Sequence, residues 1–371
     1  KRGEIAFDEY CEKFDNYSGD YKVSEEERKK TAELSEKIKG IIRKTLSRIK
    51  EHHQKQMPKD GLYESNGSLF GTIRRPIERV GLYIPGGKPL PTSLMMTAVP
   101  ARVAGVEEII VISPPKKGKL DPHLLFIAEE LNIKDIYKAG GIQGIAGLAY
   151  GIVLPKVNKI FGPGNKYVTE AKRQVFGEVG IHSLSGPSEV CIIADESADR
   201  EFVLADLLSQ IEHGKDSRAI LLTTDNSLAD YCRKPGIEID ICSSPSDCMK
   251  KSNDIGPEHL EIMTRNSFEL LSKVKNAGAV YLDEYTPVAA ADYFLGVNHV
   301  LPTGGTSKFS SVLNSSDFLK EISIARTSRR DFVQNSDLGT NLAEIEKMTR
   351  HKEALEVRRN EQEDRGSRNK N

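Results

Sequence analysis

The chain has 371 residues, of which 38% are hydrophobic, and its 53 basic and 54 acidic side chains give a formal net charge of −1. This near-neutral balance gives no electrostatic reason to expect DNA or RNA as a partner. No apolar run approaches the roughly 20 residues that a membrane span needs, and no signal peptide is visible. The five cysteines form no CxxC pair, which predicts reduced thiols in a cytoplasmic protein rather than disulfides or a Cys-zinc site.

The first predicted element is a long amphipathic helix over residues 24–50. Ser24 and Glu27 have capping-box spacing at its start. One apolar stripe runs along the helix and consists of Leu34, Ile38, Ile42, Leu46 and Ile49. A chain of this length is too long for one simple core, so we expect two major units.

From residue 107 onward, apolar strand-like runs alternate with amphipathic helices. Asp121 and Asp199 are predicted N-caps of two of these helices, and Pro122 fits the first helical position. The alternation predicts an α/β protein with parallel sheets and helices on both faces. Residues 306–371 are polar, and we expect them to be helical with a frayed end.

Three glycine-rich turns lie where a predicted strand gives way to a helix, at residues 83–89, 139–144 and 161–165. Backbone amides and helix N-termini at such turns can hold phosphate groups. None of the three has the GxGxxG or the P-loop pattern. A nucleotide site and a purely structural use of glycine in tight turns both remain open from the turns alone.

Gln210 and His213 are three residues apart at a predicted helix end, so both project from one face. They could offer an oxygen and a nitrogen to zinc. The alternative is an exposed or capping histidine at a helix C-terminus. Completing a metal site needs further ligands, and His259, His299 and His351 are the candidates, since His52 and His53 are expected to face solvent.

Two further stretches carry groups suited to chemistry. Glu258 and His259 in GPEHLEI could supply adjacent proton-transfer groups, although an acidic residue at a helix start would explain the same pattern. Asp292, Asn298 and His299 lie in a glycine-containing stretch after a predicted strand. Polar residues there fit a site on a loop, and turn formation is the alternative.

Six blocks occur in the same order as in the histidinol dehydrogenase family, which the chain resembles from about residue 1 to 359. They are RPIERVGLYIPGG, KIFGPGNKYVTEAKRQV, the GPSEV to EHG stretch, GPEHLEI, DYFLGVNHVLPT and MTRHKEAL. The resemblance implies oxidation of L-histidinol through L-histidinal to L-histidine, the last steps of histidine biosynthesis, with two NAD⁺ and one zinc per site.

The same resemblance implies a fold of two Rossmann-like parallel-sheet domains. One would combine residues 1–81 with 189–305 and carry the zinc ligands and the catalytic pair. Residues 82–188 would form the other domain and hold the NAD contacts. A helical C-terminal segment, residues 306–371, would be swapped between the subunits of a homodimer with shared active sites.

The resemblance also assigns residues to roles. The zinc ligands would be Gln210, His213, Asp292 and His351, the last from the partner subunit. His259 would take the alcohol proton, and Glu258 would activate the water that attacks the aldehyde. The expected NAD contacts are Tyr83, Gln143 and Asn165. The substrate would be held by Ser188, His299 and Glu346, together with His259 and the four zinc ligands.

The sequence departs from the family pattern at Ala291, where glycine is usual, in a shortened turn at 85–96 and in a short region at 216–256. The change at Ala291 and the shortened turn are expected to alter local geometry and, with it, NAD affinity. The rival interpretations are a same-scaffold dehydrogenase for another small alcohol such as a sulfonated diol, a binding protein without catalysis, and a purely structural α/β protein. Zinc in the purified protein would argue against the last.

Overall fold

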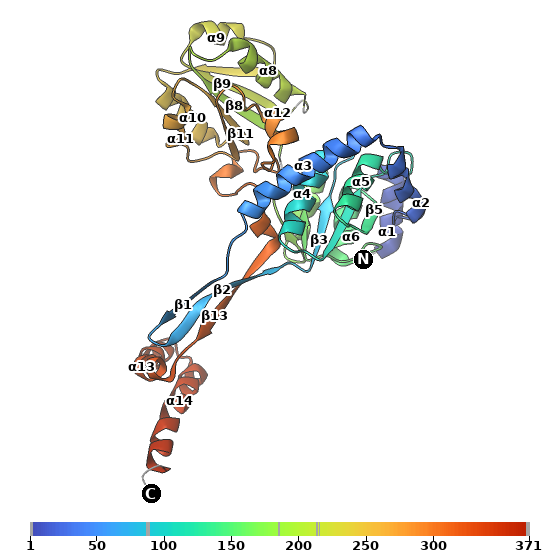
Figure 1. Cartoon of the computed structure of the whole chain (residues 1–371). Helices are drawn as coiled ribbons and strands as arrows, with labels where there is room; N and C mark the ends of the chain where they lie inside the picture. The colour runs from blue at the N-terminus through green and yellow to red at the C-terminus, as the bar shows by residue number, and fades with distance from the viewer. Residues whose placement is uncertain (1–2, 87–89, 185, 213, 215, 369–371) are drawn as a thin grey trace. The chain divides into compact units, whose positions relative to one another are not determined.

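The computed structural model describes residues 3–86, 90–184, 186–212, 214 and 216–368 (Figure 1). The chain divides into two compact units. The first unit comprises Lys1–Met57 and Pro76–Leu319, and the second comprises Pro58–Arg75 and Lys320–Asn371. The first unit carries both parallel sheets.

The first sheet is parallel and has the strand order β5-β4-β3-β6-β7. Its strands are β3 (Arg79–Tyr83), β4 (Glu108–Ser113), β5 (Asp135–Lys138), β6 (Lys159–Phe161) and β7 (Gly180–Ile181). The helices that follow the strands are α4 (Pro91–Val103), α5 (Pro122–Glu130), α6 (Gly141–Tyr150) and α7 (Lys166–Val175). Two apolar cores, one on each face, are formed between this sheet and its helices.

The second sheet is also parallel, with the order β10-β9-β8-β11-β12. Its strands are β8 (Glu189–Ala194), β9 (Arg218–Thr223), β10 (Ile237–Ile241), β11 (His259–Met263) and β12 (Ala279–Leu282). Its helices are α8 (Arg200–Ile211), α9 (Asn226–Tyr231), α10 (Pro245–Ile255), α11 (Ser267–Leu271) and α12 (Val288–Ala290), and α12 continues into the π-helical turn η3 (Ala291–Leu295). Numbered along the chain, both sheets have the order 3-2-1-4-5, the arrangement of a Rossmann-like half, so the α/β prediction is confirmed.

The N-terminal segment contains α1 (Gly3–Tyr10), η1 (Cys11–Asp15), α2 (Glu25–Arg28), η2 (Lys29–Glu33) and α3 (Glu36–Lys55). The predicted single helix over 24–50 is therefore wrong. The capping box of Ser24 and Glu27 is present, but Leu34 is extended and Ser35 caps a new helix by accepting from the Ile38 amide. Helix α3 lies beside α4 (Figure 1). Its residues Ile42, Leu46 and Ile49 are buried in a core with residues of β3 and α4, which differs from the expected grouping of residues 1–81 with 189–305.

The second unit combines a three-stranded sheet with two helices. The sheet has the order β1-β2-β13, and β1 pairs antiparallel with β2. The elements are β1 (Gly61–Ser65), β2 (Ser68–Pro76), β13 (Leu319–Arg326), α13 (Arg329–Ile345) and α14 (Thr349–Arg368). Strand β13 corrects the prediction that residues 306–371 are helical throughout. The strand is mostly exposed, so the sequence lacks the apolar run that would reveal it.

Residues 300–318 return to the first sheet, where Val300, Leu313 and Phe318 join one of its cores. This stretch contains the short 3₁₀ turns η4 (Thr306–Lys308) and η5 (Ser315–Phe318). No helix among the described residues is long and apolar enough to cross a bilayer.

All five cysteines are free and buried. Cys11 lies in a core of the first sheet. Cys232 lies in one core of the second sheet, and Cys191, Cys242 and Cys248 share the other.

Candidate active site

The GPEHLEI stretch enters strand β11 and does not begin a helix. Gly256 ends α10 in a left-handed conformation, with φ of 66°, and β11 starts at His259. The helix-start alternative is therefore wrong. In the parallel register His259 lies opposite Val190 of β8. Glu258 and Ser188 thus meet at the amino ends of two adjacent strands.

Glu258 is buried and hydrogen-bonded at this edge. Its Oε2 accepts from Ser188 Oγ at 2.6 Å and from the Glu189 amide at 3.0 Å. Burial raises the pKa of the Glu258 carboxyl to about 8, and the charges of Glu189 and Asp292 act in the same direction against the two hydrogen bonds. A carboxyl group with a pKa near neutral pH can take up and release a proton during a reaction.

His259 lies beside Glu258 and is equally buried, with 4% of its surface exposed. Its Nε2 is 3.8 Å from Glu258 Oε2. Its Nδ1 is 3.1 Å from the hydroxyl of Tyr281, on the neighbouring strand β12. If Nδ1–H donates to the Tyr281 oxygen, the lone pair of Nε2 is left on the Glu258 side, as a general base requires.

Tyr281 is a site residue that the sequence reasoning missed. Burial raises the pKa of its phenol, and the nearby charges of Asp292 and Glu258 add to the effect. The hydroxyl therefore keeps its proton beside His259. A tyrosine inside the apolar run GAVYL was the available signal, because a buried phenol needs a hydrogen-bond partner.

Three of the predicted substrate and metal residues lie in the same unit. Gln210 ends α8 and is 2% exposed, and its Nε2 has no partner among the described residues. Asp292 lies in η3, where His299 Nδ1 is 3.0 Å from its Oδ1. A buried amide with an unpaired end suits a ligand-binding role, and amide, carboxylate and imidazole are donors that zinc accepts.

The structure describes only part of the predicted zinc set. His213 lies outside the described residues, so its place is not assigned. Within the described ranges, no group of three or more His, Cys, Asp or Glu residues is arranged to hold a metal ion. Glu346 and His351 belong to the second unit, where Glu346 is the C-cap of α13 and His351 is exposed in the first turn of α14.

The loop that carries His299 is anchored by Asn298. The Asn298 Nδ2 donates to the Met96 carbonyl at 2.7 Å and lies 3.1 Å from His53 Nε2, and its Oδ1 accepts from the Val300 amide at 2.9 Å. His53 is fully buried, so the expectation that it faces solvent is wrong. Burial lowers the pKa of His53 to about 4. Asn298 thus has a structural role next to a candidate substrate contact.

A second candidate region lies at the carboxyl ends of the first sheet. Tyr83, Gln143 and Asn165, the three expected NAD contacts, line one cavity of about 740 Å³. They come from the end of β3, the start of α6 and the turn before α7. Asn165 also caps α7 by accepting from the amides of Tyr167 and Val168. The glycine-rich turns therefore converge on one cavity.

Asp15, which the sequence reasoning missed, is part of this cavity. Its Oδ2 accepts from the Gly140 amide at 2.8 Å and from Gln143 Nε2 at 2.9 Å. The Gln143 Oε1 is buried and has no partner among the described residues. Asp15 thus holds the Gln143 amide in one orientation, with its oxygen available to accept a hydrogen bond.

The turn after β6 needs glycine for a steric reason. Gly162 has φ of +104°, and a Cβ there would lie 2.1 Å from the Tyr83 carbonyl oxygen. Below the turn, the fully buried Lys172 donates from Nζ to the Gly162 carbonyl. This close approach holds the turn beside Tyr83 at the cavity.

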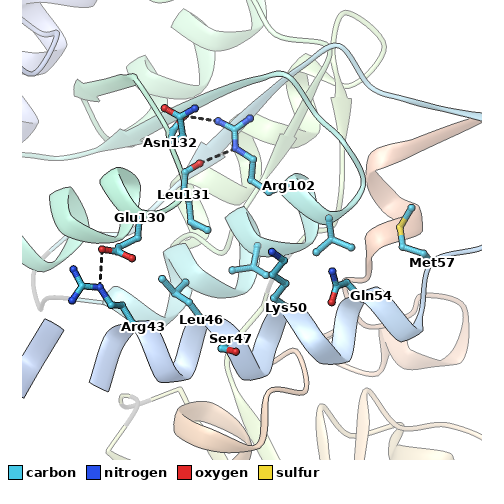
Figure 2. A pocket seen from close by; sticks show the side chains of 12 residues that line it. Arg43, Leu46, Ser47, Lys50, Gln54, Met57, Arg102, Glu130, Leu131 and Asn132 are labelled. Atoms are coloured by element: carbon cyan, nitrogen blue, oxygen red, sulfur yellow. Dashed lines mark hydrogen bonds and ion pairs between the residues drawn. The ribbon is translucent and has the colours of Figure 1, made fainter. Parts of the chain in front are cut away.

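Another cavity, of about 650 Å³, lies among α3, α4 and the end of α5 (Figure 2). Its guanidinium groups are already engaged. Arg43 Nε donates to Glu130 at 3.0 Å, and Arg102 donates to the carbonyls of Leu131 and Asn132 (Figure 2). None of the predicted site residues lines it, so we assign no function to this cavity.

Comparison with known proteins identifies the family of the chain. The histidinol dehydrogenase family model matches residues 1–235 and 233–359. The chain belongs to the histidinol dehydrogenase family. A histidinol dehydrogenase of Thermococcus kodakarensis is 57% identical over 360 residues, covering 97% of this chain and 96% of the relative. One from Methanocaldococcus jannaschii is 40% identical, covering 96% and 89% respectively.

Solved structures lead to the same family. The crystal structure of histidinol dehydrogenase from Elizabethkingia anophelis matches with a TM-score of 0.92 at 35% identity. The match covers 96% of this chain and 88% of that one. The fold of this family is therefore the fold of this chain over nearly all of its length.

Proposed function

We propose that this protein oxidises L-histidinol through L-histidinal to L-histidine, with NAD⁺ as hydride acceptor and zinc as substrate anchor. Membership of the histidinol dehydrogenase family supports the substrate. The observation that carries the chemistry is the buried Glu258–His259 pair, fixed by Ser188 and Tyr281. Such a pair can move protons in both oxidation steps.

In the first step, His259 takes the proton from the alcohol as the hydride leaves the carbon. The Tyr281 hydroxyl lies 3.1 Å from Nδ1, and when Nδ1–H donates to it, Nε2 is the basic nitrogen. The product is the aldehyde, and one proton and one hydride have been removed.

In the second step, the Glu258 carboxylate takes a proton from the water that adds to the aldehyde carbon. Because Glu258 keeps the water proton, the adduct is the hydrate anion. It then loses a second hydride and gives its remaining hydroxyl proton to His259, which has by then released the first proton to solvent, and the carboxylate of the product is left. The hydrogen bonds from Ser188 and the Glu189 amide orient Glu258 for this role.

When bound, zinc would orient the imidazole and amino nitrogens of the substrate. Two NAD⁺ molecules would bind in turn, and each would accept one hydride. We assign the zinc to Gln210, His213, Asp292 and the partner subunit's His351. We assign the dinucleotide to the cavity lined by Tyr83, Gln143 and Asn165. Ser188, His299 and Glu346 would complete the substrate contacts.

We further infer a homodimer. Its support is the apolar face of α13, where Leu338, Leu342 and Ile345 are 65%, 58% and 76% exposed. Such a face on a small unit is typical of a surface covered by another chain. The free, buried thiols fit a reducing, cytoplasmic location.

The deciding experiment measures NADH formed per L-histidinol consumed, with the product identified, before and after chelation and return of zinc. We expect two NADH for each histidine formed, with loss of turnover on chelation and recovery with zinc. Failure of a zinc-loaded protein to turn over histidinol would contradict the substrate and direct attention to other small alcohols.

Replacing His351→Ala tests the shared metal site. We expect zinc affinity to fall in both sites of the dimer, because each site loses one ligand. The matched control is His123→Ala, at the start of α5, which should leave zinc binding unchanged. Full zinc occupancy in His351→Ala would contradict the shared site.

A further inference from the structure

Glu261 of β11 and Asp206 of α8 form a pair of acidic side chains, the first buried and the second half-buried, which the proposed reaction does not use. Glu261 of β11 is 1% exposed, and its carboxyl faces that of Asp206 on α8 within hydrogen-bonding reach. The Glu261 Oε1 accepts from the Val288 amide at 2.8 Å. No N–H or O–H donor among the described residues reaches its Oε2.

Two facing carboxylates repel each other, and the buried, unpaired Oε2 of Glu261 loses its hydration without compensation. A single proton between the two groups removes both problems, because one carboxyl then donates to the other. Burial and the neighbouring Asp206 both raise the pKa of Glu261, which agrees with a retained proton. Tyr281, opposite Glu261 in the strand register, adds a neutral phenol to the surroundings.

The pair connects three elements that carry candidate site residues. Glu261 lies two residues after His259, so both project from the same face of β11. Asp206 lies one helical turn before Gln210 on α8. Val288 begins α12, which leads within four residues to Asp292.

We propose that Asp206 and Glu261 share one proton and act as positioning residues, which fix the end of α8 and the start of α12 and thereby place Gln210 and Asp292. The role in zinc binding rests on the proposed function. Neither residue is assigned a contact with substrate, dinucleotide or metal.

Isosteric and apolar variants separate a shared proton from mere packing. In Glu261→Gln an amide N–H takes the place of the shared proton, and the amide oxygen can still accept from Val288. In Glu261→Met the volume is similar, but both hydrogen bonds are lost. We expect zinc affinity, measured by competition with a chromophoric chelator, to stay within about 3-fold in Glu261→Gln and Asp206→Asn and to fall about 10- to 100-fold in Glu261→Met.

Amide hydrogen exchange provides a readout that needs neither zinc nor turnover. We expect faster exchange at residues 206–212 and 288–295 in Glu261→Met, and unchanged exchange in Glu261→Gln. Protection that is unchanged in Glu261→Met, or lost equally in Glu261→Gln, would overturn the positioning role. If the wild type binds no zinc while the two variants still differ in exchange as expected, the proposed function is contradicted and the positioning role stays intact.

Infrared spectroscopy tests the proton itself. The Glu258→Gln background removes the buried carboxyl of Glu258, whose pKa burial also raises. There, we expect a protonated-carboxyl band at neutral pH that disappears on adding Glu261→Gln. Absence of that band in the Glu258→Gln protein would overturn the shared proton.

Discussion

The two parallel sheets have the same strand order, but their candidate functional residues lie at opposite edges. In the first sheet they follow the strands, as Tyr83 and Asn165 do at the ends of β3 and β6. In the second sheet they precede the strands, as Ser188 and Glu258 do at β8 and β11. Ligands of open α/β sheets usually bind at the carboxyl edge, so the second sheet departs from the rule.

The difference follows from the kind of group each edge supplies. The carboxyl edge of the first sheet offers glycine turns and helix N-termini, whose amides suit a phosphate-bearing cofactor. The amino edge of the second sheet receives the C-terminal end of α8 and buried side chains with altered pKa values. In the proposed function, the first sheet would hold the cofactor and the second would carry out the proton chemistry.

The largest expected effect is at the amino edge. In Glu258→Gln we expect histidinal oxidation to fall about 10²- to 10⁴-fold, because the base for water is lost, while histidinol oxidation falls less. In the wild type, kcat/KM for histidinal should rise with pH through about 8, where the carboxyl loses its proton, and this rise should vanish in the variant. Half-reaction kinetics measure both effects.

The control is Glu269→Gln, on the surface of α11, which should leave both half-reactions unchanged. NAD⁺ affinity should stay the same in Glu258→Gln. Equal losses in the two half-reactions would contradict the assignment of Glu258 to water activation, and a large change in NAD⁺ affinity would undermine the division between the sheets.

A smaller effect is expected at the carboxyl edge of the first sheet. Asp15→Ala removes the acceptor for the Gly140 amide and the Gln143 side chain, so we expect the KM for NAD⁺ to rise about 10- to 100-fold. The kcat and zinc content should change little. Steady-state kinetics test this, with the exposed Asp20→Asn as control. A loss of kcat at unchanged KM would place Asp15 in the chemistry instead.

The last expected effect is on stability and concerns the His299 loop. The folded state disfavours charged His53, whose pKa is lowered from 6.5 to about 4. The stability that neutral His53 contributes is therefore complete above about pH 6.5 and is lost as the pH falls from about 6.5 towards about 4. His53→Gln should reduce this acid loss by up to a few kcal/mol. Guanidinium unfolding at several pH values measures the free energy of unfolding. The control is His52→Gln, at a half-buried position; an equal change there would show that burial of His53 is not the cause.

The sequence predicted those parts of the fold that depend on residues close together in the chain. Apolar runs identified several of the parallel strands but not β7, β10 or β11, and the N-caps at Asp121 and Asp199 are present as expected. Strands β1, β2 and β13 escaped because polar, exposed residues form them and their pairing joins distant parts of the chain. The sequence placed Glu258 and His259 at a helix start, whereas the αL Gly256 ends α10 and strand β11 begins at His259.

For the candidate site, residue types and spacing were compatible with both functional and structural roles. The functional roles were assigned from the family resemblance. Partners that are remote in sequence could not be predicted. Asp15 binds Gly140 across 125 positions, and Tyr281 reaches His259 from the adjacent strand. Such contacts depend on how strands and helices assemble, which no local pattern encodes.

The five buried cysteines allow local unfolding of the protein to be measured. A thiol reagent can modify a cysteine only when the surrounding core exposes it, so the modification rate measures local unfolding. Cys11 reports on the first sheet, and Cys191, Cys242 and Cys248 report on one face of the second. Peptide-resolved labelling in the presence of NAD⁺ or zinc would thus show, without any introduced probe, which sheet each ligand stabilises.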